Sequence, residues 1–241
     1  MTQHSTETQH STETQRADDA QRTTGHRRYT DVLREQNRSD WDRAVQHRFV
    51  DELLEGSLPD ETMAEYLIQD HRFLDAFVTL IGAAMATSDK AQARLRFGRF
   101  AGMVCGEEDT YFLRAFDALG VDEDARLHRP DTAATAGLTS LMRKAAASGS
   151  YPAVLAVLNV AEWLYQDWAH RSAVSLPENF VHREWITLHN NEDFDQFVAF
   201  LREELDRVGP GASGEVEMYF SQAVGLELEF FDGIYPERDI A

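Results

Sequence analysis

Apolar residues recur at helical spacing along most of the chain, and no segment alternates with the period of two that marks a strand. The first apolar stripe covers residues 41–54. After a turn at 56–60, which carries a helix start signal, a second stripe covers 63–81. A third helix is expected over about 89–119, ending at Gly120. The first half of the chain therefore predicts three helices.

The second half continues the helical pattern. A helix is expected over about 132–147, and the next, over about 152–171, is apolar nearly all round, which is typical of the centre of a bundle. A sixth region opens at Pro177, breaks near 189–192 and resumes to about 208. The last helix is expected over about 214–234. The pattern predicts an all-α fold, a single bundle of about seven helices.

The N-terminal segment lacks this pattern. The hexapeptide Thr-Gln-His-Ser-Thr-Glu occurs twice in tandem, starting at Thr2 and Thr8, and it has no apolar side chain to bury. We expect residues 1–36 to be a disordered low-complexity tail and residues 37–241 to form the helical domain. The histidines of the repeat are more readily explained by a solvated tail than by a metal site.

The charge of the chain excludes some partners. With 23 Lys and Arg against 42 Asp and Glu, the net charge is −19. That argues against nucleic acid and anionic membranes, which both attract basic surfaces. Lys90 and Lys144 are the only lysines, and an acidic, lysine-poor surface suggests the salt-rich cytosol of a halophile.

The cysteine content points to the cytoplasm. Cys105 is the only cysteine, so neither an internal disulfide nor a thiolate metal cluster can form. No apolar run is long enough to span a bilayer, and the N-terminus lacks the apolar segment of a signal peptide. We expect Cys105 to be a buried structural residue, because no histidine or lysine lies near it in sequence to activate a thiolate.

Three carboxylates interrupt apolar helical faces. Asp70 has Tyr66, Leu67, Phe73 and Leu74 three and four residues away, and Glu227 has Ala223, Val224, Phe230 and Phe231 at the same offsets. Glu162 interrupts the all-apolar helix, whereas Glu229 falls on a more polar side and should be solvated. A buried acid is costly unless it is paired. Each is either satisfied by an arginine or backbone donor, or shares a functional pocket.

Other candidates for chemistry are weaker. His189, at the predicted break, could act as a ligand or proton carrier, but a capping or surface role is the more frequent one for such a residue. The segment 189–193 lacks paired ligands at helical spacing, so no metal is predicted. The chain contains no phosphate loop, dinucleotide fingerprint, nucleophile elbow or HExxH motif.

Several motifs resemble one known family in order and spacing. The strongest is Tyr66-Leu-Ile-Gln-Asp70, and it is accompanied by His47-Arg-Phe-Val, Gly56-Ser-Leu-Pro, Leu138-Thr-Ser-Leu-Met142, Trp163-Leu-Tyr165, Trp185-Ile186 and Glu227-x-x-Phe-Phe231. Over about 47–235 the chain resembles the TenA family, also called thiaminase II or aminopyrimidine aminohydrolase. The resemblance implies a haem-oxygenase-like bundle, usually a homotetramer, that works without metal, haem or another cofactor.

The resemblance also implies an activity. Family members cleave the bond between a pyrimidine methylene and its amine or thiazolium substituent, and the hydroxymethylpyrimidine product is salvaged for thiamin synthesis. Asp70 falls on the family aspartate that hydrogen-bonds the aminopyrimidine, and Glu227 on the glutamate that protonates the leaving group.

The departures from the family pattern indicate a subclass. Ala161 stands where the family has its nucleophilic cysteine, while Leu138, His189 and Phe73 stand where the family often has tyrosines. Glu162 adjoins the lost cysteine, as in the cysteine-less class, which is associated with hydrolysing aminopyrimidines and their formylated forms.

The expected site combines both lines of reasoning. Asp70, Glu162 and Glu227 are the predicted catalytic residues, with Glu162 as the base toward water and Glu227 as the acid, their pKa values pushed apart. The predicted contacts to a small aminopyrimidine are Asp70, Phe73, Phe77, Leu138, Trp163, Tyr165, His189 and Phe231.

Other functions stay open beside this one. A non-catalytic pyrimidine-binding or regulatory protein is the first alternative, because the family cysteine and tyrosines are lost. A di-iron oxygenase on the same fold would need pairs of iron ligands that this sequence lacks. Pyrroloquinoline-quinone synthase relatives would need a basic, histidine-rich site that this sequence does not show.

Overall fold

The described chain is helical throughout. The computed structural model describes residues 27–173 and 175–235, and no strand occurs within these ranges. The all-α prediction is confirmed, but about seven helices was too few, because several long apolar stripes are broken into shorter segments. Within the same ranges, no helix combines the length and the apolar character that crossing a membrane requires.

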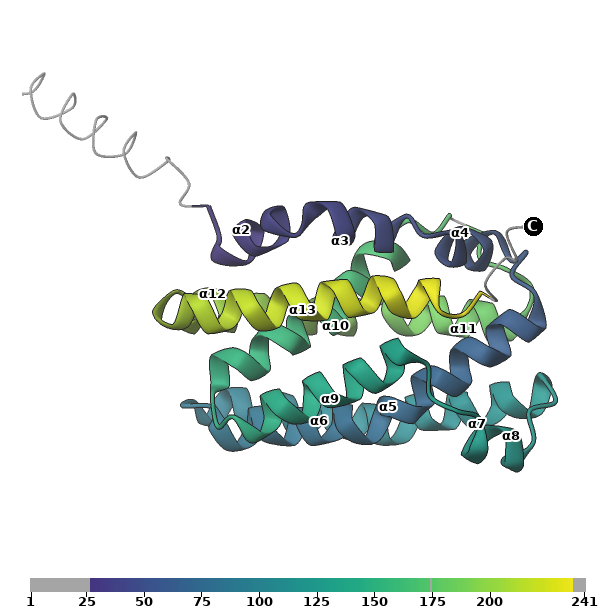
Figure 1. The fold of residues 1–241 in the computed structure, drawn as a ribbon, viewed down its shortest axis with the longest axis horizontal. Helices are drawn as coiled ribbons and strands as arrows, with labels where there is room; N and C mark the ends of the chain where they lie inside the picture. Colours follow the sequence, from purple (N-terminus) through teal and green to yellow (C-terminus); the bar gives the residue numbers. More distant parts are fainter. Residues whose placement is uncertain (1–26, 174, 236–241) are drawn as a thin grey trace, which may run out of the picture.

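The helices follow one another with short connections, as Figure 1 shows. In chain order they are α2 (Tyr29–Gln36), α3 (Arg38–Val45), α4 (Arg48–Glu55), α5 (Asp60–Thr87), α6 (Ala91–Met103), the π-helix η1 (Val104–Glu108), α7 (Asp109–Ala118), α8 (Glu123–His128), α9 (Ala133–Ala147), α10 (Tyr151–Ala169), α11 (Phe180–His189), α12 (Glu192–Val208), the 3-10 helix η2 (Gly209–Ala212) and α13 (Ser213–Asp232).

Helix α10 is the centre of the bundle, as its apolar sequence predicted. It packs against α13, α12, α5 and α9, and almost every one of its side chains is buried. Ser150 caps its start by accepting a hydrogen bond from the Ala153 amide, and Pro152 occupies the first turn, where a missing N–H costs nothing. In Figure 1, α5, α6 and α9 lie on one side of α10 and α13, and α2 to α4 lie on the other.

The predicted third helix is not continuous. A π-turn, η1, separates α6 from α7, and the segment ends at Gly120, which has a positive φ of 68°. Cys105 lies on η1 and is exposed, so the expectation of a buried cysteine was wrong. The wider π-turn turns this side chain away from the core that Val104 enters.

Two other boundaries can be compared with the prediction. The break near 189–192 is confirmed, since α11 ends at His189 and Asn191 caps α12 by accepting from the Phe194 amide. The tail was expected to reach residue 36, but α2 begins at Tyr29 and buries Leu33 completely. The folded chain therefore begins earlier than predicted, and the expected disorder of residues 1–26 lies outside the described residues.

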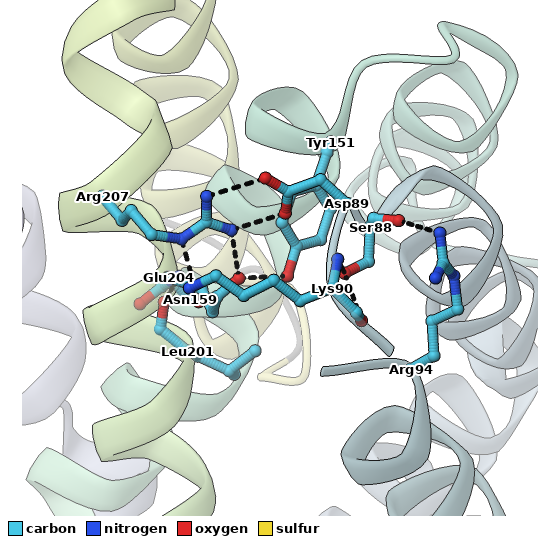
Figure 2. A network of polar contacts seen from close by, with 9 residues as sticks. All are labelled: Ser88, Asp89, Lys90, Arg94, Tyr151, Asn159, Leu201, Glu204 and Arg207. Atoms are coloured by element: carbon cyan, nitrogen blue, oxygen red, sulfur yellow. Dashed lines mark hydrogen bonds and ion pairs between the residues drawn. The ribbon is translucent and has the colours of Figure 1, made fainter. Parts of the chain in front are cut away.

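A network of polar contacts links helix α12 to the segment that connects α5 with α6 (Figure 2). The Glu204 carboxylate on α12 accepts hydrogen bonds from Lys90 Nζ at 3.1 Å, from the Tyr151 hydroxyl at 3.0 Å and from Arg207 Nε at 3.0 Å. Arg207 also donates two bonds to Asp89, at 2.9 and 2.7 Å. This buried acid is thus fully paired.

Candidate active site

A cavity between the helices collects four carboxyl groups from four different segments. Asp70 comes from α5, Glu108 from η1, Glu162 from α10 and Glu227 from α13. The cavity has an empty volume of about 620 Å³, its open mouth included. The three acids predicted from sequence are therefore brought together, and a fourth joins them.

The rest of the lining is mostly apolar and aromatic. It comprises Phe73, Leu74, Phe77, Phe100, Met103, Met142, Ala161, Tyr165, Trp185, Leu188, His189 and Phe194. Flat aromatic walls around a few polar groups suit a small, flat ligand that is oriented by hydrogen bonds.

Helical spacing explains why the predicted acids point inward. Asp70 is only 6% exposed and shares its face of α5 with buried Tyr66 and Leu67. Glu227 is 2% exposed and shares its face of α13 with Phe230 and other buried residues, because side chains three and four apart lie on one side of a helix. Glu229 is exposed, as predicted.

None of the four cavity acids has a hydrogen-bond or salt-bridge partner in the part of the chain that the structure describes. The Oε2 atom of Glu227 is fully buried and unpaired. Glu204 gives the contrast, since it is as buried as Asp70 and Glu162, at 6%, but holds the partners shown in Figure 2. This fold pairs a buried acid that serves structure. The unpaired cavity acids are therefore candidates for contacts with a ligand.

The pKa values follow from this difference. Burial would raise the pKa of Glu204, but hydrogen bonds from Arg207, Lys90 and Tyr151 outweigh it and lower the pKa. In the cavity, burial raises the pKa of Glu227 to about 8 and that of Glu108 to about 7.

The other two acids shift in the same direction. Burial, followed by the charges of Glu108 and Glu227, raises the pKa values of Asp70 and Glu162 well above their usual range. The pKa values of Glu162 and Glu227 are therefore both raised, and the predicted separation of the two values stays a prediction. No lysine or arginine is among the cavity's described lining residues, so nothing there lowers either pKa.

His189 is buried and lines the cavity, so the capping or surface role was the wrong expectation. Its Nδ1 lies 2.9 Å from the Trp185 carbonyl oxygen, which can only accept, so Nδ1 carries the proton and Nε2 is an acceptor. Burial lowers its pKa to about 4, which makes this ring neutral at physiological pH. Nearby, the Tyr165 hydroxyl is hydrogen-bonded to that of Tyr66 at 3.0 Å.

The predicted ligand contacts divide into two groups. Phe73, Phe77, Tyr165 and His189 line the cavity together with Asp70.

The other three predicted contacts, Leu138, Trp163 and Phe231, do not line it. Trp163 lies under the Arg202 guanidinium at 3.9 Å, and Phe231 stacks on Phe49 with ring centroids 5.4 Å apart. Leu138 is buried in the core. Trp163 follows Glu162 directly and lies about 100° further around α10, on the side that meets Arg202.

Glu108 is the functional candidate that the sequence reasoning missed. Its neighbours at four residues before and three and four after are Val104, Tyr111 and Phe112, all buried, which is the same signal that marked Asp70. The signal is hidden because Glu108 sits in a run of three acids with Glu107 and Asp109. Such a run is typical of a solvated face.

The cavity lining contains no cysteine among the described residues. Ala161 lines the cavity, whereas the thiol of Cys105 is exposed on η1 and is not part of the lining. Within the described residues, no group of three or more His, Cys, Asp or Glu side chains is placed to hold a metal ion.

The chain is similar in sequence and in fold to several known proteins. The model of the TENA/THI-4/PQQC family matches residues 34–235. Aminopyrimidine aminohydrolase of Halalkalibacterium halodurans is 23% identical over 212 residues, which cover 86% of this chain and 95% of that protein.

Solved structures are similar in fold. A TenA family transcription regulator from Silicibacter sp. TM1040 has a TM-score of 0.75 at 23% identity, covering 86% of this chain and 96% of the other. A domain of unknown function with a heme oxygenase-like fold from Shewanella denitrificans OS217 has a TM-score of 0.61 at 16% identity, covering 85% and 91%. The predicted haem-oxygenase-like fold is confirmed.

Proposed function

Because the chain belongs to the TENA/THI-4/PQQC family, as its motifs predicted, we propose that it is a hydrolase of aminomethyl-pyrimidines or formylaminomethyl-pyrimidines. The product would be hydroxymethylpyrimidine, which serves thiamin salvage. One observation carries the proposal: three nearly fully buried carboxyl groups, Asp70, Glu162 and Glu227, face one aromatic-walled cavity without partners among the described residues. Sequence similarity to the aminopyrimidine aminohydrolase of H. halodurans also supports this proposal.

The ring would be held by one acid and the aromatic walls. A protonated aminopyrimidine presents two N–H donors on one edge, which match the two oxygens of the Asp70 carboxylate. Phe73, Phe77 and Trp185 offer apolar surface for the ring faces. Such a pose leaves the methylene substituent for the remaining carboxyl groups.

The other two acids would then carry the chemistry. Glu227, whose pKa is about 8, holds a proton at neutral pH and donates it to the departing nitrogen as the C–N bond breaks. Glu162 accepts a proton from water as the new C–O bond forms. Its raised pKa is lowered when a cationic substrate enters, because a nearby positive charge favours the carboxylate. One water is consumed, and the amine and hydroxymethylpyrimidine leave.

The test is turnover by the purified protein with matched variants. We expect wild type to release ammonia and hydroxymethylpyrimidine from aminomethyl-pyrimidine. Glu227→Gln and Glu162→Gln should lose at least about a hundredfold in kcat, the usual size for one acid or base. Glu229→Gln is the control on the same helix as Glu227, and its exposed side chain should be dispensable. Full activity in Glu227→Gln would exclude the acid role, and full activity in Glu162→Gln the base role.

A second function is favoured by one observation. Ala161 lines the cavity where family members have a nucleophilic cysteine, so the chain could bind a pyrimidine without converting it. Calorimetry distinguishes the two functions. Tight binding of aminomethyl-pyrimidine with no ammonia over many hours would favour a binding or regulatory protein.

A further inference from the structure

Glu108 occupies a different position from the other three cavity acids. It ends the π-helix η1, and it is partly exposed, whereas Asp70, Glu162 and Glu227 are between 2% and 6% exposed. Two residues close to it in sequence, Met103 at the end of α6 and Glu107 on η1, each line the same two hollows on the outer surface. Glu108 therefore lies at the outer side of the cavity, between the buried acids and the solvent.

The π-turn explains how an acid can reach this place. A π-turn widens the helix by one residue and is frequent at functional sites. Val104 at its start enters the core, and Glu108 at its end enters the cavity, while Cys105 and Glu107 between them stay exposed. The same short segment thus has one acid inside and one outside.

The cavity has four acids and no counter-charge in its described lining. Its one basic side chain is His189, which is neutral because burial lowers its pKa to about 4. Burial raises the pKa of Glu108 to about 7 and that of Glu227 to about 8, because no cation in the described lining favours either carboxylate. The unpaired, deeply buried Oε2 of Glu227 shows independently that this polar lining lacks a partner.

We propose that Glu108 is a specificity residue that makes the cavity select ligands with a positive charge over neutral ligands of the same shape. The occupant would be a flat heteroaromatic ring with an ammonium substituent on a short arm. In the reaction proposed above, this ammonium passes one proton to the Glu108 carboxylate, and Glu227 then protonates the resulting amine as the C–N bond breaks. An ammonium supplies the donors and the charge that the acids lack, whereas a neutral hydroxyl supplies one donor and no charge. This inference rests on the proposed function for the ring. Beyond that function, it specifies that the substituent is positively charged and that Glu108 recognises this charge.

The proposal can be tested by binding alone. The probes are two aminopyrimidines that have either an aminoethyl or a hydroxyethyl arm in place of the aminomethyl arm. Neither has nitrogen on the carbon next to the ring, so neither contains the bond to be hydrolysed. Calorimetry on the full chain compares wild type with Glu108→Gln. Glu107→Gln is the matched control, one residue away on the same π-turn and outside the cavity lining.

We expect wild type to bind the aminoethyl probe more tightly than the hydroxyethyl probe. Glu108→Gln should lower this preference by about tenfold or more, the size of one charge-assisted hydrogen bond, and Glu107→Gln should leave it unchanged. Binding of the aminoethyl probe should also release protons, measured in buffers of different ionisation enthalpy, and Glu108→Gln should release fewer. Affinity for the hydroxyethyl probe reports that the variant's cavity is intact.

Two results would overturn the inference. Equal weakening of both probes in Glu108→Gln would show that the residue only shapes the cavity, and an unchanged preference would show that it does not read charge. Failure of the proposed function alone gives a different result. In that case wild type binds the two probes with the expected preference but releases no ammonia from aminomethyl-pyrimidine. If neither probe binds to wild type, the pyrimidine site and the inference fall together.

Discussion

Replacing the Glu227 carboxyl with a group that cannot ionise should make the protein more stable at neutral pH while impairing the proposed activity. Burial raises the pKa of this carboxyl from 4.5 to about 8, so the folded protein keeps a proton that the unfolded chain releases. The contribution of Glu227 to stability is therefore greatest below pH 4.5 and is lost progressively as the pH rises toward 8. At 1.36 kcal/mol per pKa unit, the loss by pH 7 is about 3 kcal/mol.

Glutamine has nearly the same shape and cannot ionise. In Glu227→Gln the amide replaces a protonated carboxyl in the same unpaired environment. The two proteins therefore differ in their free energy of unfolding mainly by the cost of keeping the Glu227 carboxyl protonated in the folded state. We expect the variant to gain about 3 kcal/mol at pH 7 and almost nothing near pH 4.5. For a domain of this size the gain at pH 7 corresponds to roughly 6–12 °C in Tm.

The assay is urea and thermal unfolding at pH 5 and pH 7, at one protein concentration for wild type and variants. Glu229→Gln on the same helix removes an exposed carboxyl and should change stability by less than about 0.5 kcal/mol at either pH. A Glu227→Gln variant that is less stable than wild type at pH 7 would contradict this prediction. An equal change at both pH values would also refute it, because the effect would then not depend on ionisation.

Three further predictions concern activity, the cavity and the polar network. The kcat/KM for aminomethyl-pyrimidine should fall as the pH rises through about 8, since Glu227 must hold its proton; a profile flat to high pH would contradict this. In a Cys105→Ser background, Ala161→Cys should introduce a thiol that a small alkylating reagent modifies and that bound hydroxymethylpyrimidine protects; labelling without protection would place the ligand elsewhere. Glu204→Ala should cost about 1–3 kcal/mol in urea unfolding, because Tyr151 and Arg207 lose their acceptor; an unchanged midpoint would count against the network.

The sequence predicts inward-facing acids correctly on helices that bury one face and expose the other. Asp70 and Glu227 stand on such helices, so the apolar residues three and four positions away were enough to predict their direction. The same argument fails on α10, which is buried all round. There the periodicity cannot tell that Glu162 faces the cavity while Trp163 faces Arg202.

Irregular backbone limited the rest of the prediction. The π-turn shifts the helical register in the middle of an apparently continuous stripe, which left Cys105 exposed and concealed Glu108 within an acidic run. His189 ends a helix at a break, where local sequence favours a capping role. Its burial against Tyr165 and Trp185 depends on α10 and α11 meeting, which only the tertiary structure shows.

In the function we propose, the carboxyl-lined cavity hydrolyses a C–N bond with water as the attacking group. The most direct measurement is mass spectrometry of the product formed from aminomethyl-pyrimidine in water enriched in the heavy oxygen isotope. We predict that hydroxymethylpyrimidine carries the solvent oxygen, that one ammonia accompanies each product molecule, and that Glu162→Gln forms almost none. The proposed function would be contradicted if wild type forms no hydroxymethylpyrimidine. It would also be contradicted if Glu162→Gln forms this product as fast as wild type does.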